Sequence, residues 1–231
     1  MPLLKISELS IDEDSVLRNL GVDPGTIRQR KPELVEMTRR ALLDGRSFLE
    51  PQILYRKLKV KSFRHQQVLL EDGNKLSGQL IADHLGFAEY VVLLLCTVGD
   101  RIEAHISAAM GSDVLYGLAL DGFGSAAVEA LANAACNFFE EEAAETGLQP
   151  SVPLSPGMIG WDVERGQREL FEILDGSQVV VTLSERSVMI PRKSLTMAVG
   201  FGQEASTSGR TCDFCAMKER CHYKDHYAPV A

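Results

Sequence analysis

A long segment crowded with small residues, residues 112–146, most constrains how this chain can fold. Its pattern is mostly helical, and alanine, glycine and serine dominate its middle between Gly124 and Ala135. Small side chains allow a helix to approach its neighbour closely, so the segment predicts a helix packed against a sheet. Asp121-Gly122-Phe123-Gly124 is a candidate break in this helix, because glycine disfavours a helix interior.

The apolar run at residues 89–97 is typical of a buried strand. Helices and strands alternate along the rest of the chain without a regular βαβ rhythm, which favours an α+β fold over a doubly wound α/β fold. We expect a mixed or antiparallel twisted sheet packed by helices. The other expected helices are 10–20, 32–45, 77–85, 99–110 and one capped by Asp162, and the other expected strands are 52–63, 67–71, 179–183, 189–191 and 195–201.

The bulk properties exclude several classes of protein. The chain has 231 residues, 45% of them hydrophobic, and a net charge of −8, which argues against a nucleic-acid surface. The longest apolar run, Tyr90–Cys96, is too short to span a bilayer, and no signal peptide is evident. We therefore expect a cytoplasmic protein with reduced thiols and no membrane partner. Cys96 and Cys136 are interpreted as core thiols.

The remaining cysteines, Cys212, Cys215 and Cys221, form a C-x2-C-x5-C pattern near the C-terminus. Thiolates at this spacing favour zinc or an iron–sulfur cluster, and a cytoplasmic location favours a metal over a disulfide. His222, His226, a water or a partner molecule are candidates for a fourth ligand. Reduced thiols without a metal, or a disulfide, are the alternatives.

Two further segments have unusual composition. Residues 154–161, Leu-Ser-Pro-Gly-Met-Ile-Gly-Trp, form a rigid loop in which glycine lets a ligand approach the main chain, although an ordinary loop with a packed Trp would look the same. Residues 183–195, Leu-Ser-Glu-Arg-Ser-Val-Met-Ile-Pro-Arg-Lys-Ser-Leu, cluster hydroxyls and charges between apolar runs, as a solvated hairpin tip also does.

Taken together, these segments resemble the activation (reactivation) domain of vitamin B12-dependent methionine synthase. The order is a Pro-Gly loop, an amphipathic helix, a strand, the pattern at 183–195 and a glycine-containing strand. Shorter stand-alone relatives also end in a cysteine tail like residues 212–221. The resemblance covers mainly residues 115–221, and it predicts that the antiparallel sheet and its helices adopt the activation-domain fold.

The resemblance implies that the chain binds S-adenosylmethionine (AdoMet) and presents it to oxidised cobalamin on a corrinoid-binding methionine synthase subunit, while a flavodoxin- or ferredoxin-like protein donates an electron. The D-x-H-x-x-G cobalamin pattern is absent, since Asp83-His84-Leu85-Gly86 has the wrong spacing, so the cofactor would arrive on the partner. We expect an activation-like domain at residues 1–202 and a linker with the cysteine tail at 203–231.

The resemblance also implies the ligand contacts. The acidic AdoMet contact falls at Glu129, for which a helix-pairing carboxylate is the alternative. The loop contacts fall at Ser155, Pro156, Gly157 and Met158. The chain departs from the family pattern at two positions, because Pro153 and Met158 stand where the family has Arg and Tyr.

These departures weaken the case for tight AdoMet binding, and Arg165 and Arg186 are candidate replacements for the missing guanidinium. They also leave a second hypothesis open. The chain would then dock on a corrinoid protein without binding AdoMet, with the cysteine tail serving as an iron–sulfur electron relay or as a zinc clip.

Overall fold

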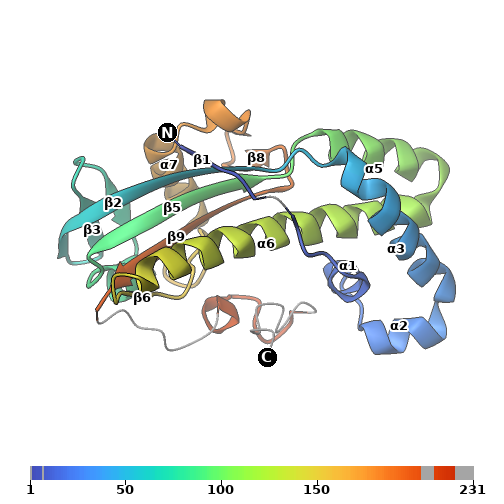
Figure 1. The fold of residues 1–231 in the computed structure, drawn as a ribbon, viewed down its shortest axis with the longest axis horizontal. Coiled ribbons are helices and arrows are strands. Elements are labelled where there is room, and N and C mark those ends of the chain that lie inside the picture. The colour runs from blue at the N-terminus through green and yellow to red at the C-terminus, as the bar shows by residue number, and fades with distance from the viewer. Residues whose placement is uncertain (1, 7, 204–210, 222–231) are drawn as a thin grey trace.

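The computed structural model describes residues 2–6, 8–203 and 211–221. Within them, helices cover both sides of one central sheet (Figure 1). The helices are α1 (Glu13–Asn19), α2 (Pro24–Arg30), α3 (Pro32–Gly45), α4 (Gln79–Leu85), α5 (Arg101–Ser112), α6 (Val114–Ala144) and α7 (Val163–Ile173). The strands are β1 (Leu3–Leu4), β2 (Gln52–Arg64), β3 (Gln67–Leu70), β4 (Lys75–Ser77), β5 (Tyr90–Thr97), β6 (Gln149–Pro150), β7 (Thr182–Leu183), β8 (Met189–Ile190) and β9 (Ser194–Gly202).

The central sheet is antiparallel, with strand order β4, β3, β2, β5, β9, β6 and β1 added against β2. The long strand β2 pairs with β5 along its first half and with β3 along its second half. Its register shifts between Val60 and Ser62, and such irregularities bend a strand. The predicted α+β class with an antiparallel sheet is confirmed.

Strand β5 separates two hydrophobic cores. Its side chains alternate, so that Leu94 and Cys96 pack on the α6 side while Leu93 and Leu95 pack on the opposite side. All four residues are fully buried. Because both faces of the strand are covered, its sequence is a continuous apolar run rather than an alternating one.

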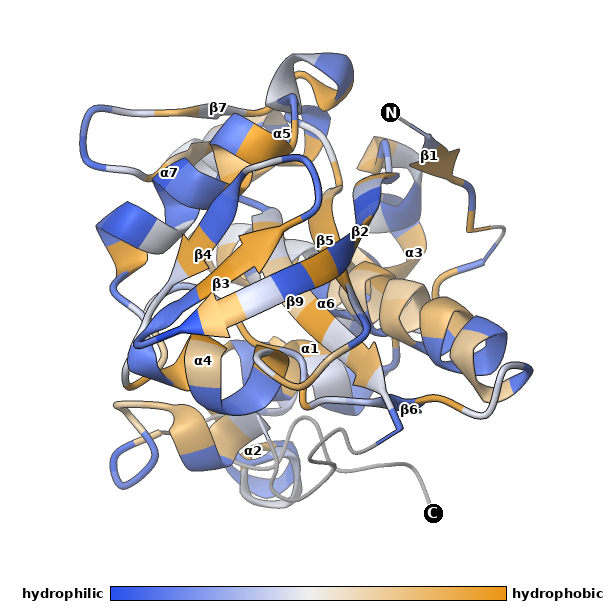
Figure 2. Ribbon diagram, turned by 90° about the vertical axis from the view of Figure 1, so that its left-hand side faces the viewer, coloured by the Kyte–Doolittle hydropathy of each residue, from blue (hydrophilic) through white to orange (hydrophobic). Residues whose placement is uncertain are grey.

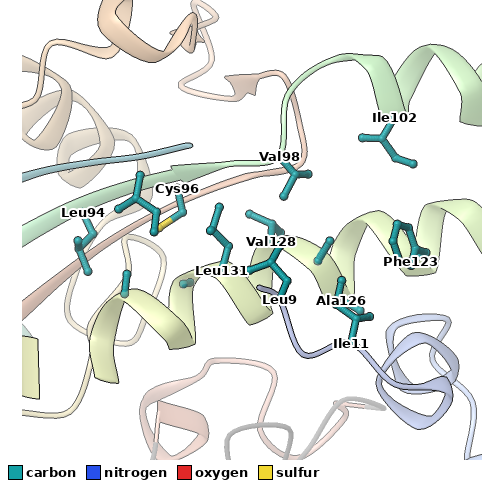
Figure 3. Packing of buried hydrophobic residues seen from close by; sticks show 14 of the residues in the cluster. Leu9, Ile11, Leu94, Cys96, Val98, Ile102, Phe123, Ala126, Val128 and Leu131 are labelled. Atoms are coloured by element: carbon teal, nitrogen blue, oxygen red, sulfur yellow. The ribbon is translucent and has the colours of Figure 1, made fainter. Parts of the chain in front are cut away.

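Helix α6 runs along the sheet as one unbroken helix of 31 residues, so the expected break at Asp121–Gly124 is wrong (Figure 1). The glycines there serve packing. A Cβ on Gly122 would lie 2.8 Å from Leu20 Cγ of the α1 segment, and one on Gly124 would lie 3.3 Å from Lys193 Cε. Figure 3 shows Val128 and Leu131 of this helix packed beside β5, as the small-residue pattern predicts.

By length and composition alone α6 is apolar enough to cross a membrane, and it is the one such helix among the described residues. In this fold 61% of its most apolar window is buried inside the protein. It is therefore accounted for as the core helix of the α6 side.

The opposite side of the sheet is covered by α4, α7 and the loop at residues 154–161. Leu80, Leu154, Trp161 and Leu170 belong to this second core. Figure 2 shows the largely hydrophilic outer surface of α7 beside β4 and β3. This face holds the loop that the sequence singled out.

Most predicted elements are present with shifted ends, but the short strands β1, β4 and β6 had no prediction. Helix α2 was not expected, and residues 179–183 do not form a five-residue strand. Gly176–Val179 form a short 3-10 helix, Val180 is left-handed with φ of 55°, and Thr182–Leu183 alone are extended. The boundary predicted at residues 202/203 stays a prediction, because residues 204–210 and 222–231 lie outside the described residues.

Candidate functional site

The loop at residues 154–161 is fixed at its start by the sheet. Leu154 N donates to Ala198 O of β9 at 2.9 Å, and Ala198 N donates back to Leu154 O at 2.8 Å. The loop then closes on itself, because Gly157 N donates to Trp161 O and Trp161 N donates to Met158 O, both at 2.9 Å. Gly157 has φ of 99°, a left-handed conformation that favours glycine.

The single Trp of the chain, Trp161, anchors the end of this loop in the second core with 1% of its surface exposed. Helix α7 lies directly against the indole, since a Cβ on Gly166 would be 2.6 Å from Trp161 Nε1. The indole N–H is buried and has no hydrogen-bond partner among the described residues. Such a group normally finds a partner, and this one lies at the contact between the loop and α7.

Helix α7 begins at the loop because Asp162 caps it, with Asp162 Oδ1 accepting from Arg165 N at 2.8 Å. Its inner face buries Gln167 and Leu170, and Gln167 Oε1 accepts from Thr196 of β9 at 2.9 Å. Arg165 and Glu169, one helical turn apart, therefore share a different face of the helix.

Three adjoining hollows share Ser77 and Arg165 and together form one groove. The hollow beside the loop has a volume of about 650 Å³ and is lined by Gly157, Met158 and Trp161. The hollow along α7 has about 640 Å³, and the third, at the β2–β3 turn, has about 420 Å³. These volumes fall in the range of about 300–1,000 Å³ that is usual for small-molecule sites.

The floor of the groove is main chain packed against main chain. A Cβ on Gly78 would lie 2.6 Å from Gly160 O, and Leu80 N donates to the same oxygen at 3.3 Å. Glycine at position 78 therefore brings the start of α4 into direct contact with the loop. A ligand in this groove would meet backbone groups as well as side chains.

Some charged side chains that line the groove form hydrogen bonds or ion pairs, and others do not. Glu169 Oε2 accepts from Ser77 N at 2.8 Å. Burial raises the pKa of this carboxyl, against the opposing effects of the Ser77 hydrogen bond and the nearby charges of Arg165 and Lys75. Arg168 is paired with Glu164 at 2.6 Å, whereas the Arg165 guanidinium has no ion pair or side-chain hydrogen bond within the described ranges.

The structure brings the predicted loop residues together but not Glu129. Gly157 and Met158 line the groove, and Ser155 and Pro156 belong to the same turn. Glu129 lies on α6, on the other side of the sheet, where its Oε2 accepts from Asn19 Nδ2 at 3.0 Å. Its predicted contact with a ligand stays a prediction.

Sequence reasoning missed most of the groove. It named Arg165 as a candidate replacement, but it did not identify Ser77, Gly78 or Glu169. The one local signal for the pair on α7 was the i, i+4 spacing of Arg165 and Glu169 after the Asp162 cap. The β-hairpin end that completes the groove comes from a distant part of the sequence.

The segment 183–195 has a part that is packed against α6 and a part that is exposed to solvent. Lys193 is largely buried, and its Nζ contacts Ser125 Oγ and Asp121 Oδ1 of α6, each at 2.8 Å. The Lys193 ammonium group therefore links the start of β9 to α6. The β7–β8 hairpin carries the rest of the motif.

The cysteine segment 211–221 lies against the groove loop. Ile159 N donates to Phe214 O at 2.8 Å, and the Phe214 ring meets the edge of His84 at 4.6 Å between centroids. Met217 N donates to Cys215 Sγ at 3.4 Å. No group of three or more His, Cys, Asp or Glu side chains in the described parts of the chain could hold a metal, so the site predicted at Cys212, Cys215 and Cys221 stays a prediction.

The other two thiols are core residues, as predicted. Cys96 and Cys136 are buried, and burial raises the pKa of both. The pKa of Cys136 rises to about 12, which keeps its thiol protonated at neutral pH.

The fold matches a solved structure described as the MetH reactivation domain bound to AdoHcy (S-adenosylhomocysteine). The match has a TM-score of 0.60 and covers 87% of this chain and 75% of that chain, at 14% sequence identity. The predicted resemblance to the activation-domain fold is therefore confirmed at the level of fold. No protein-family model matches the sequence. A search of curated proteins found no match either.

Proposed function

We propose that this chain is an activation subunit for a corrinoid-dependent methionine synthase. In this role it binds AdoMet in the groove beside residues 154–161 and supports remethylation of oxidised cobalamin on a partner protein. The observation that carries the proposal is the fold match to a reactivation domain solved with AdoHcy, the product that AdoMet leaves after methyl transfer.

The groove fits such a ligand in size and in chemistry. Its volume suits a nucleoside with an amino acid side arm, and its floor offers main-chain groups at Gly78 and Gly160. Met158 adds a polarizable surface beside this polar floor.

The chemistry belongs to the substrates, and the chain positions them. One electron reduces the partner's Co(II) to Co(I), which takes the methyl group from the AdoMet sulfonium and leaves AdoHcy. In the proposed role, this protein holds the sulfonium near the surface so that a corrinoid module can reach it. A flavodoxin- or ferredoxin-like donor, the corrinoid partner and the cytoplasmic location remain parts of the proposal.

The cysteine segment supplies the second candidate role. Its contact with the loop through Ile159 and Phe214 supports a place for it beside the groove. A zinc ion or an iron–sulfur cluster at Cys212, Cys215 and Cys221 would act there as a clip or as an electron relay. Anaerobic purification followed by zinc, iron and acid-labile sulfide analysis tests this role without reference to AdoMet.

A reconstituted remethylation assay tests the main proposal. A corrinoid-loaded methionine synthase module in the Co(II) state is mixed with AdoMet and a chemical reductant, with and without this chain, and methylcobalamin formation is followed by absorbance. We expect the chain to accelerate the reaction and to require AdoMet. An unchanged rate, together with no detectable heat when AdoMet is titrated into the chain, would contradict the proposal.

A further inference from the structure

Arg165 is an arginine at the groove that forms no ion pair within the described residues. It lines all three hollows, and within the described ranges its guanidinium has no ion pair. Other arginines of the chain do have one, for example Arg56 with Asp72 at 2.9 Å and Arg168 with Glu164 at 2.6 Å. In a protein of net charge −8, an arginine left unpaired at a concave surface is available to an anionic ligand group.

Glu169 is the fixed negative group of the same groove. Its Oε2 is held by Ser77 N at 2.8 Å, which orients the carboxylate at the end of β4. Its Oε1 has no hydrogen bond among the described residues. One oxygen therefore anchors the side chain, and the other is available as an acceptor.

The two groups lie one helical turn apart on α7 but do not form an ion pair with each other. Opposite charges at this spacing would ordinarily pair on a free helix surface. Here the Ser77 contact holds Glu169 toward β4, while Arg165 faces the hollow beside Gly78 and Trp161. The groove thus presents a cationic and an anionic group side by side, which matches the adjacent ammonium and carboxylate of an α-amino acid.

We propose that Arg165 and Glu169 bind the amino acid headgroup of the groove ligand, with Arg165 on the α-carboxylate and Glu169 on the α-ammonium. This inference rests on the proposed function, because it assigns the methionyl arm of AdoMet to α7 and the nucleoside to the loop side. It also accounts for Pro153, since the guanidinium that the family places in the loop is supplied here from the next helix.

Isothermal titration calorimetry with two ligands tests the assignment. AdoHcy carries the amino acid arm, whereas 5′-methylthioadenosine has the same nucleoside thioether without it. The variants are Arg165→Met and Glu169→Gln. Gln keeps an oxygen for Ser77 N, so it removes the charge while preserving that hydrogen bond. Arg39→Met is the control, because Arg39 is an exposed arginine of α3 that pairs with Glu13 and lines none of the three hollows.

We expect Arg165→Met and Glu169→Gln each to weaken AdoHcy binding about tenfold or more, as for loss of a charge-assisted hydrogen bond. Affinity for 5′-methylthioadenosine should stay within about twofold in both variants, and Arg39→Met should change neither affinity. Circular dichroism and thermal unfolding of each variant show that it is folded before the titration.

The remaining outcomes are distinguishable. If the wild-type chain binds AdoHcy but Arg165→Met and Glu169→Gln weaken both ligands equally or neither, the headgroup assignment is overturned and the proposed function stands. If the wild-type chain binds neither AdoHcy nor AdoMet, the proposed function fails and the assignment fails with it.

Discussion

The two sides of the central sheet are built differently. On the α6 side, small and apolar residues pack closely, and even the largely buried Lys193 meets Ser125 and Asp121. On the groove side, Trp161 buries an indole N–H without a partner, and Arg165 forms no ion pair among the described residues. Each core is apolar, but only the second leaves polar groups that need something from outside.

This difference separates stability from function. Native interiors satisfy nearly all buried polar groups, so an exception is a place to look for a ligand. In this account the α6 side does not change on ligand binding, whereas on the groove side Arg165 gains a partner. Substitutions on the two sides should therefore separate into those that change unfolding and those that change affinity.

The largest effect is expected on the α6 side. Phe123 of α6 is fully buried against α3, so Phe123→Ala should lower the free energy of unfolding by about 3–5 kcal/mol. Urea denaturation followed by circular dichroism measures this. Phe138→Ala, at a ring that is 41% exposed on the same helix, is the control and should cost much less. Equal costs for the two variants would contradict a tightly packed α6 side.

A smaller effect is expected where the groove floor is formed. In Gly78→Ala the new Cβ would meet Gly160 O at 2.6 Å, so the loop must shift, at a cost of about 1–3 kcal/mol in unfolding free energy. AdoHcy affinity should fall as well, because the loop lines the groove. Gly111→Ala on α5, where a Cβ meets nothing, is the control: it should leave AdoHcy affinity unchanged and raise the unfolding free energy by up to about 1 kcal/mol, because alanine favours a helix over glycine. An unaltered affinity in Gly78→Ala would place the ligand elsewhere.

A third effect, weaker still, is expected from Arg165. The side chain is exposed and unpaired within the described residues, so Arg165→Met should change the unfolding free energy by no more than about 0.5 kcal/mol. The same variant is the one expected to lose AdoHcy affinity. Large destabilisation by Arg165→Met, measured in urea, would mean that the guanidinium stabilises the folded protein. The proposed difference between a stabilising α6 side and a ligand-binding groove side would then be wrong.

The smallest effect concerns the pH dependence of stability. Burial raises the folded-state pKa of Glu169 above its ordinary value, so the folded protein binds more protons than the unfolded chain. The contribution of Glu169 to stability is therefore fully present below the unfolded pKa near 4.5 and is lost as pH rises through the folded pKa. Comparing wild type with Glu169→Gln in urea across this range should reveal that loss, and a difference independent of pH would contradict it.

The sequence predicted the parts of this molecule that depend on local pattern. The apolar run of β5 and the Asp162 cap of α7 were found because burial on both faces and helix capping have local signatures. The break expected in α6 was wrong because Gly122 is required for close packing against Leu20, which is far away in the sequence. The strand expected at 179–183 was wrong because Val179 joins the core from a 3-10 helix rather than from a strand.

The site was predictable only in part. Gly157 and Met158 were reached through the resemblance, and the groove contains both. The environment of Glu169 depends on Ser77, 92 residues away, and that of Glu129 depends on Asn19, 110 residues away. No local pattern carries such pairings, so the sequence could not tell which carboxylate lines the groove.

The central claim is that the ligand binds in the groove on the loop side. The NMR resonance of the Trp161 indole N–H tests this claim most directly. The chain has one Trp, so its indole N–H gives a single assigned cross-peak in a proton–nitrogen correlation spectrum. Titration with AdoHcy should move this peak saturably, with the affinity that calorimetry gives, because Trp161 lines the hollow in which the nucleoside is placed. An indole peak that stays in place while calorimetry shows saturation would put the ligand elsewhere and contradict the account.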